Sequence, residues 1–152
     1  MVSPEIIRRY KYFSTISFAQ INMLASIAEE VEYEAGHYFH QEGDDVSKVY
    51  IIEQGEISLV KPFPQQDKEV VINTLSAGDV FGWTSLLPPY TAGSGAKSIG
   101  KCKLLEFDSA LLREKFEADY EFGYLMMVKI AQIIRERLDS IVIETLAYQA
   151  EQ

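Results

Sequence analysis

The sequence predicts a mainly β fold with flanking helices: an antiparallel β-roll of the jelly-roll (double-stranded β-helix) type, followed by a long C-terminal helix. Apolar and polar residues alternate with a period of two in the middle of the chain, whereas both ends show helical spacing. Glycines punctuate the alternating segment where antiparallel strands would turn, at Gly36, Gly43, Gly55, Gly78 and Gly82. We therefore expect a single domain over residues 1–152, with helices in 1–31, the roll in 31–107 and helices in 108–150.

The N-terminal segment is predicted to be helical. Pro4 suits the first turn of a helix, because its fixed φ is compatible with that position and its missing N–H would have no partner there. Ser17 is expected to cap a second helix, and Gln20, three residues later, completes the pattern of a capping box. Four glutamates follow this helix and are interpreted as its solvated end: Glu29, Glu30, Glu32 and Glu34.

The central segment contains short runs that are typical of strands. In residues 49–54, the odd-numbered side chains are expected to face one way and the even-numbered ones the other. Residues 70–72 and 104–107 read as further strands. Residues 61–69, KPFPQQDKE, contain two prolines and are interpreted as a loop between hairpin arms.

The C-terminal segment is predicted to form two helices. Asp108 is expected to cap the first, and the second runs from Tyr120 to Gln149 without a proline. Its apolar residues recur at a spacing of three and four: Met127, Ile130, Ile134, Leu138, Ile141 and Ala147. A helix this long cannot bury both sides against a small roll, so we predict that its free side packs on a second copy of the chain, forming a homodimer. The alternative is that the helix folds wholly onto its own domain.

Composition excludes several classes of function. With 14 basic and 23 acidic residues, the chain lacks the positive charge that direct nucleic-acid binding requires. Short basic clusters, such as Arg135 with Arg137, are interpreted as solvated faces. No apolar run is long enough to cross a membrane, and the start lacks a secretory signal. The single cysteine, Cys102, is interpreted as a packed thiol, and a chain without an internal disulfide favours a cytoplasmic location.

Several segments then occur in a specific order: GHYFHQEGDDVSKVYIIEQGEISLV, GDVFGWTSLL, CKLLEFD and the long helix. Over roughly residues 13–145, this order resembles the cyclic nucleotide-binding domain of catabolite-activator-type transcription regulators, kinase regulatory subunits and gated channels. The resemblance implies an eight-stranded roll with a ligand pocket inside it, and a final helix that serves as dimer axis and ligand-sensing lid. In such regulators a DNA-binding helix-turn-helix domain follows this helix. Here the chain ends at Gln152, so we expect either a free-standing sensor that acts through a protein partner, or a sensor half whose output domain lies on another polypeptide or was cut away.

The resemblance also identifies a phosphate-binding cassette, and this sequence departs from its pattern. In the family, a glutamate after the second glycine of the GDVFG-type phrase holds the ribose, and an arginine followed by a small hydroxyl residue holds the cyclic phosphate. Trp83 stands at the glutamate position, the arginine position falls near Ala92, and no arginine lies between Arg9 and Arg113. Since hydrogen bonds to charged groups contribute roughly 1.5–3 kcal/mol each, we expect weak binding of cyclic AMP and a different small-molecule effector, either another cyclic nucleotide or another anion.

The candidate ligand-binding residues surround this cassette: Phe81, Gly82, Trp83, Thr84, Ser85, Ser94 and Lys97. Lys97 is a candidate replacement for the missing cation, although as a point charge rather than a planar fork. The glycine-rich segment TAGSGAK is either a nest for an oxyanion or a plain solvent loop. Trp83 either stacks on a ligand or fills the space that a nucleotide would occupy.

Two other functions are considered beside the non-catalytic sensor. The first is a degenerate relative that binds no ligand and acts as a dimerisation or protein-interaction scaffold. The second is a cupin-like metalloenzyme, which the sequence disfavours, because His37 and His40 would point to opposite faces of a regular strand. Both histidines are interpreted as surface or turn residues. No arrangement typical of a catalytic nucleophile is present, so we expect neither a metal site nor an enzyme.

Overall fold

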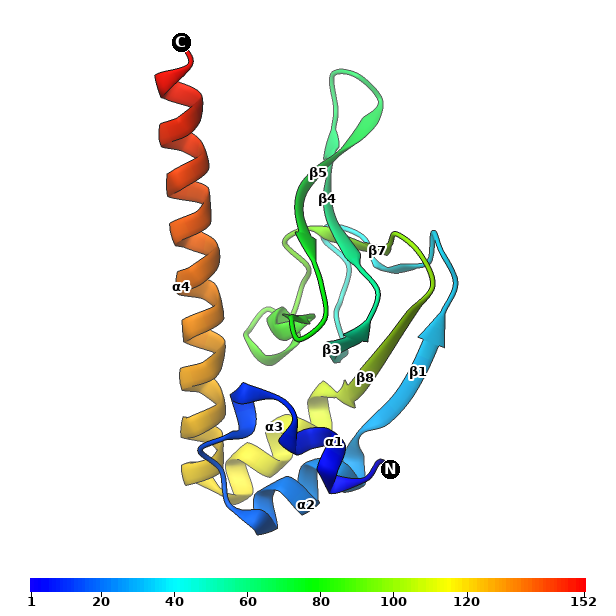
Figure 1. The fold of residues 1–152 in the computed structure, drawn as a ribbon, viewed down its shortest axis with the longest axis vertical. Helices are drawn as coiled ribbons and strands as arrows, with labels where there is room; N and C mark the ends of the chain where they lie inside the picture. Colours follow the sequence, from blue (N-terminus) through cyan, green and yellow to red (C-terminus); the bar gives the residue numbers. More distant parts are fainter.

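The computed structural model describes residues 1–152 and shows two four-stranded antiparallel sheets (Figure 1). One sheet has the order β1-β8-β3-β6 and the other the order β2-β7-β4-β5. The strands are β1 (Glu29–Tyr33), β2 (Tyr38–His40), β3 (Lys48–Gln54), β4 (Ile57–Phe63), β5 (Lys68–Leu75), β6 (Val80–Phe81), β7 (Gly95–Ser98) and β8 (Cys102–Asp108). The predicted β-roll is therefore confirmed.

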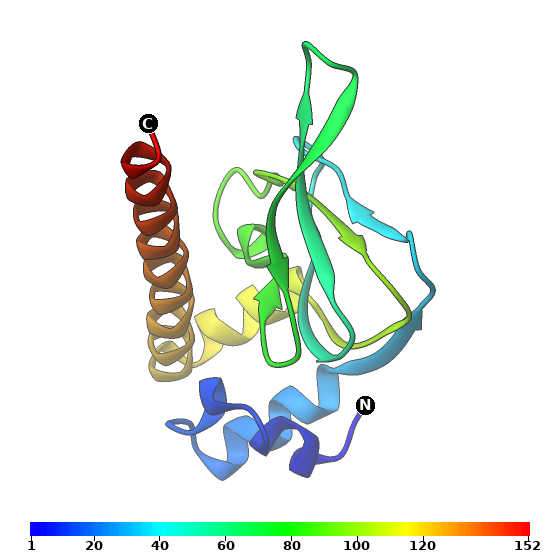
Figure 2. The same ribbon diagram turned by 45° about the horizontal axis from the view of Figure 1, so that its top comes forward.

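Helices lie at one end and along one side of the roll. They are α1 (Pro4–Arg8), η1 (Lys11–Phe13), α2 (Phe18–Ile27), η2 (Trp83–Leu86), α3 (Ser109–Ala118) and α4 (Tyr120–Ala150). In Figure 1, α1, α2 and α3 gather below the roll, while α4 rises beside it to the C-terminus. Figure 2 shows from a second direction that α4 stays on one side, and that the β4–β5 hairpin projects away from α1 and α2. No helix combines the length and the hydropathy that crossing a bilayer demands.

The predicted helix caps are confirmed. The Ser17 hydroxyl accepts a hydrogen bond from the Gln20 N–H at 3.2 Å, and the Gln20 side-chain oxygen accepts one from the Ser17 N–H at 2.9 Å. The Asp108 carboxylate accepts from the Leu111 N–H at 2.9 Å, so β8 passes directly into α3. These caps satisfy N–H groups that would otherwise lack partners at the first turn of each helix.

Alternation along β3 divides the apolar residues between two cores. Val49 and Ile51 pack against the helices, whereas Tyr50 and Ile52 pack inside the roll. Cys102 is buried in the inner core, as expected of a packed thiol. The sheet β1-β8-β3-β6 is thus covered by helices on its outer face and by the second sheet on its inner face.

The structure corrects two expectations about local structure. The glutamates from Glu29 to Glu32 belong to the strand β1, because α2 already ends at Ile27 and Ala28 adopts an extended conformation. Val31 and Tyr33 alternate with these glutamates and pack on the inner core, which is the period of a strand rather than of a helix end. The expected loop 61–69 does connect the two arms of a hairpin but is shorter, because β4 continues to Phe63 and β5 begins at Lys68.

Candidate ligand-binding site

The site begins at a turn that only glycine accommodates. Gly82 has φ = +77°, and a Cβ atom built on it would lie 2.3 Å from the Lys48 carbonyl oxygen. A side chain there would therefore combine an unfavourable backbone conformation with a clash against the backbone of β3. Glycine allows the single turn η2 to start directly after β6 and to lie close against β3.

Buried serines hold this turn in place. The Ser85 hydroxyl donates to the Gly82 carbonyl at 2.6 Å and also contacts the Ser109 hydroxyl at the start of α3. Arg113 of α3 donates to the Ser85 carbonyl, and its guanidinium lies 4.3 Å from the centre of the Tyr90 ring. Ser85 and Ser109 are fully buried. Ser85 therefore anchors η2 to α3.

A cavity of about 120 Å³ lies beside η2. Strands β2, β4 and β6, the turn η2, the segment before β7 and the helix α4 all contribute to its wall. Its lining residues are His40, Leu59, Phe81, Gly82, Trp83, Thr84, Gly93, Ser94 and Arg137. The fold thus brings together five of the residues selected from the sequence: Phe81, Gly82, Trp83, Thr84 and Ser94.

Lys97, the only charged candidate, does not line this cavity. Its neighbour Ala96 is buried inside the roll, so alternation along β7 directs Lys97 outwards. The Lys97 ammonium lies 5.0 Å from the centre of the Tyr38 ring and 4.0 Å from the Glu69 carboxylate. The cation that the cassette lacks is therefore not supplied by Lys97 in this structure.

The glycine-rich segment is held by backbone hydrogen bonds. The Ala92 carbonyl accepts from the Gly43 N–H at 2.8 Å, and the Ala92 N–H donates to the Asp44 carbonyl at 2.9 Å. Ala92 itself is buried, whereas Gly93 and Ser94 line the cavity. The segment near the expected arginine position is therefore part of the cavity wall and presents no cationic side chain there.

His40 is a cavity residue that the sequence interpretation missed. A register shift between Tyr38 and His40 breaks the regular alternation of β2, so that Phe39 packs inside the roll and His40 lines the cavity. Its Nδ1 lies 3.1 Å from the Ser94 carbonyl oxygen, while its Nε2 is buried and has no hydrogen-bond partner. His37, by contrast, stacks on Tyr33 at 4.1 Å. The interpretation of His40 as a surface or turn residue was wrong.

Burial determines the charge state of His40. Desolvation lowers the pKa of the ring, and the hydrogen bond to the Ser94 carbonyl opposes this effect only in part. A neutral ring whose Nδ1–H donates to that carbonyl leaves Nε2 as an acceptor. The cavity wall therefore contains one buried acceptor without a hydrogen-bond partner.

Arg137 is the second missed residue, and it comes from α4. Its guanidinium donates to the Val80 carbonyl at 2.6 Å and lies 5.6 Å from the centre of the Trp83 indole. Burial lowers its pKa, partly offset by Asp79 and Tyr12. The ion pairs of the chain involve Arg8 and five lysines but not Arg137. The interpretation of Arg137 as part of a solvated face was wrong.

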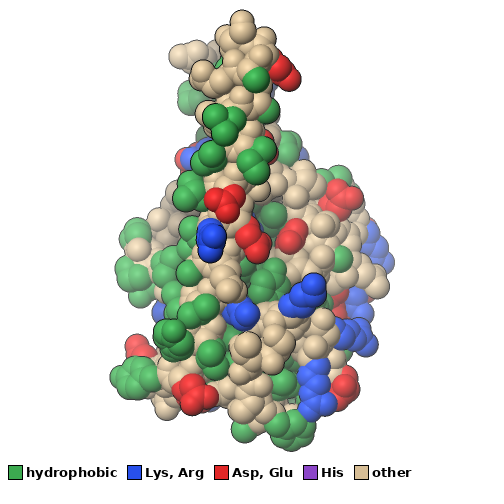
Figure 3. Space-filling model, turned by 60° about the vertical axis from the view of Figure 1, so that its left-hand side comes forward, with side chains coloured by type: hydrophobic (Ala, Val, Ile, Leu, Met, Phe, Trp, Pro, Cys, Tyr) green, Lys and Arg blue, Asp and Glu red, His purple; other side chains and the backbone are tan.

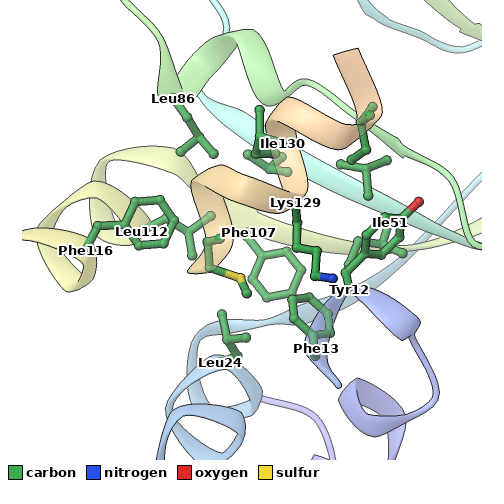
Figure 4. Close-up of a pocket in the computed structure, with 14 residues that line it drawn as sticks. Tyr12, Phe13, Leu24, Ile51, Leu86, Phe107, Leu112, Phe116, Lys129 and Ile130 are labelled. Atoms are coloured by element: carbon green, nitrogen blue, oxygen red, sulfur yellow. The ribbon is translucent and has the colours of Figure 1, made fainter. Parts of the chain in front are cut away.

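A different cavity lies between α4, the neighbouring helices and the outer face of the sheet (Figure 4). Its volume is about 60 Å³, and of its 14 lining residues 13 are hydrophobic. Lys129 is the exception, and in Figure 4 its side chain runs from α4 towards Tyr12 and Phe13. This volume is well below the roughly 150 Å³ of an apolar cavity that binds benzene, so we assign it to core packing.

The roll, its internal cavity and the long helix that contributes to the cavity wall define a regulatory domain of the ligand-binding type. Residues 30–119, more than half of the chain, match the family model of the cyclic nucleotide-binding domain. The chain belongs to this family.

Curated relatives support this assignment. The chain is 26% identical over 131 residues to a CRP-like cAMP-activated global transcriptional regulator from Mycobacterium tuberculosis, with 86% of this chain and 58% of the regulator covered. It is 29% identical over 108 residues to a cAMP-dependent protein kinase regulatory subunit from Schizosaccharomyces pombe, with 71% of this chain and 25% of the subunit covered. The chain therefore spans little more than half of the first protein and a quarter of the second.

Solved structures share the fold. A candidate cyclic nucleotide-binding protein from Geobacter metallireducens has a TM-score of 0.81 and 25% identity, covering 91% of this chain and 99% of that one. The Thermus thermophilus catabolite activator protein has a TM-score of 0.70 and 20% identity, covering 97% of this chain and 63% of that one. At 20% identity, the similarity to the Thermus thermophilus protein concerns the fold alone.

Proposed function

We propose that this chain is a non-catalytic sensor that binds an anionic small molecule in the cavity beside η2 and signals through α4. One observation carries the proposal: a single cavity is lined both by η2 and by Arg137 of α4. A ligand that contacts both elements favours one position of the helix over others, and this differential contact is what couples binding to a change elsewhere.

The effector we propose is not standard cyclic AMP. Trp83 replaces the expected carboxylate with an apolar ring, and the wall formed by Gly93 and Ser94 contributes no guanidinium. The cavity is also smaller than the roughly 300–1,000 Å³ of pockets that enclose drug-sized ligands. The residues present therefore fit a cyclic nucleotide poorly, although related domains are described with cAMP bound.

We further propose that α4 forms a homodimer and acts on a protein partner. The distal part of the helix exposes a series of large apolar side chains: Leu138, Ile141, Val142, Ile143 and Leu146. Figure 3 shows several hydrophobic side chains, in green, on the part of the molecule that projects beyond the roll. Several exposed large apolar side chains on a projecting helix are typical of an interaction surface.

Intrinsic fluorescence and calorimetry test the sensor. Trp83 is the only tryptophan and lines the cavity, so ligand binding should change the fluorescence of the protein directly. We expect a change in fluorescence and melting temperature with at least one anion from a panel of cyclic AMP, cyclic GMP, inorganic phosphate and small carboxylates. No change with any of them would contradict the sensor.

A ligand-free scaffold is the second candidate, and the position of Trp83 favours it. The indole packs against the core between the roll and the helices, as expected if it strengthens the fold where a ligand once bound. Under this candidate, the panel gives no response while the protein still dimerises. The unsatisfied Nε2 of His40 in the cavity opposes it, because a site kept only for packing has no use for a buried acceptor without a partner.

A further inference from the structure

The starting point is a half-buried cation that forms no ion pair, although the more distant Asp79 carboxylate favours its charged form. Arg137 has one hydrogen bond, to the Val80 carbonyl, out of the five that a guanidinium can donate, and no carboxylate pairs with it. Removing a charge from water is unfavourable unless an opposite charge or several dipoles replace the lost hydration. The Trp83 ring supplies a cation–π contact but no net charge. An anion at the cavity would complete this arrangement.

The charge balance of the wall indicates a monoanion. Arg137 is the one permanent charge among the lining residues, and burial favours the neutral form of His40. A doubly charged phosphate monoester would therefore keep an uncompensated charge in the cavity. A planar carboxylate matches the fork of a guanidinium, which can donate two parallel hydrogen bonds to it.

The remaining lining residues indicate the polarity and the size of the rest of the ligand. Leu59, Phe81 and Trp83 provide apolar and aromatic walls, while Thr84 and Ser94 provide polar atoms. His40 lines the wall, and its Nε2 is an acceptor without a hydrogen-bond partner; because this atom is buried, a ligand hydroxyl reaches it only after a small movement of the wall. A volume of about 120 Å³ is comparable to the roughly 150 Å³ cavity that encloses one benzene molecule, and it is below the roughly 300–1,000 Å³ of pockets that enclose larger ligands.

We propose that this site binds a compact organic carboxylate of about the size of benzoate, whose charge pairs with Arg137. This inference rests on the proposed sensor function and specifies its ligand class. The apolar body of the ligand lies between Phe81 and Trp83, and a hydroxyl substituent donates to His40 Nε2. The cation missing from the segment around Ala92 is supplied instead from α4, by a residue distant in sequence.

Because Arg137 belongs to α4, a ligand bound to it contacts this helix directly. Arg137 donates to the Val80 carbonyl at the start of β6, immediately before the turn that carries Trp83. A carboxylate adds an attraction between the helix and the roll at this point. Binding should therefore favour conformations in which α4 is held against η2, and the position of the distal helix then reports occupancy.

The test is a titration of the full chain with benzoate, 3-hydroxybenzoate, 4-hydroxybenzoate, benzamide, inorganic phosphate and cyclic AMP, followed by Trp83 fluorescence and calorimetry. Benzamide has the shape of benzoate without its charge. We expect benzoate to bind at least tenfold more tightly than benzamide, and at least one hydroxybenzoate to bind more tightly than benzoate. Phosphate and cyclic AMP should bind more weakly than the carboxylates.

Three variants test whether Arg137 is the residue that pairs with the carboxylate. Arg137→Gln should weaken benzoate binding at least tenfold, Arg137→Lys should weaken it less, and neither should change the response to benzamide. Arg135→Gln, which alters an exposed arginine two residues away on the same helix, should bind like the wild type. Circular dichroism and melting curves establish that each variant is folded, and Arg137→Lys keeps the test valid if Arg137→Gln does not fold.

The outcomes separate this inference from the sensor itself. Equal benzoate affinity in the wild type and Arg137→Gln overturns the carboxylate proposal. Binding of cyclic AMP or inorganic phosphate without any binding of the carboxylates also overturns it, but leaves the sensor function standing. Failure of every compound to bind contradicts both.

Discussion

The guanidinium of Arg137 lies 5.6 Å from the centre of the Trp83 ring, although the two residues belong to elements far apart in the sequence. Trp83 stands where the family resemblance expects a glutamate. A glutamate at this position would neutralise the nearby arginine, whereas an indole contacts the cation through its ring face and leaves its charge available. The substitution that removes a nucleotide contact therefore also keeps Arg137 free for another anion.

This relationship leads to a prediction for variants that restore the family residues. Trp83→Glu should not by itself confer tight binding of cyclic AMP, because the cavity wall still lacks an arginine for the phosphate. Gly93 is the better position for that arginine than the buried Ala92, because it lines the cavity and a Cβ atom there meets nothing within 4 Å. We expect Trp83→Glu/Gly93→Arg to bind cyclic AMP at least tenfold more tightly than the wild type in calorimetry.

The single variants serve as controls for this gain of function. Gly93→Arg alone should improve cyclic AMP binding less than the double variant, and Trp83→Glu alone should lower the affinity for small carboxylates by pairing with Arg137. A double variant that binds cyclic AMP no better than the wild type would show that the cavity differs from a nucleotide site in more than these two residues.

Gly82 should be the least replaceable glycine of the site. Alanine there must adopt φ = +77° and place its Cβ atom 2.3 Å from the Lys48 carbonyl oxygen. We expect Gly82→Ala to lower the free energy of unfolding by about 2–3 kcal/mol, since a strained backbone and a shift of β3 both contribute. Urea denaturation measures the change, with Gly100→Ala as the control because its Cβ atom would lie in open space. Equal stabilities of the two variants would contradict this account of the turn.

The fold is more predictable from the sequence than the site. The roll is predictable because Val49 to Ile52 alternate between two buried faces, and period-two patterns persist through most strands. The failure at β1 is instructive: Glu29 and Glu30 resemble a charged helix end, but Val31 and Tyr33 already carry the strand period. In a short strand at the edge of a sheet, exposed charged residues can therefore hide the alternation of the few residues that face the core.

The site residues divide along the same line. Residues 81–84 are contiguous and follow a recognisable glycine turn, so the sequence identifies them. His40 reaches the cavity only because the register of β2 shifts. Arg137 reaches it only because α4 passes beside the cavity at this residue. Neither a bulge nor the path of a 31-residue helix is encoded in the residues next to His40 or Arg137. Such contacts between distant segments require the tertiary structure.

The stability of the protein should fall in mild acid because of His40. Burial holds the pKa of the folded-state ring below its ordinary value of 6.5, so the unfolded chain takes up a proton at a higher pH than the folded chain. The stabilisation that the neutral His40 ring gives the folded state is fully present above pH 6.5. It is lost as the pH falls through 6.5 towards the folded-state pKa, and the free energy of unfolding then decreases by less than about 1.4 kcal/mol per pH unit.

Urea denaturation at pH 7.5, 6.5 and 5.5 measures this effect. We expect His40→Gln to reduce the loss of stability between pH 7.5 and 5.5, because the substituted side chain does not titrate there. His37→Gln keeps His40 and should retain the wild-type slope. If His40→Gln retains it as well, the acid sensitivity arises from groups other than His40.

The distal half of α4 should control the oligomeric state. Ile141 and Leu138 are each 59% exposed and lie about one turn apart on the same helix. If they meet a second copy of the chain, Ile141→Glu places a carboxylate in an apolar interface, where desolvation costs several kcal/mol and should convert the dimer to a monomer. Ser140→Glu adds the same charge on another side of the helix and should leave the dimer intact. Sedimentation equilibrium distinguishes these cases, and a wild-type chain that is monomeric at high micromolar concentration would refute the helix-mediated dimer.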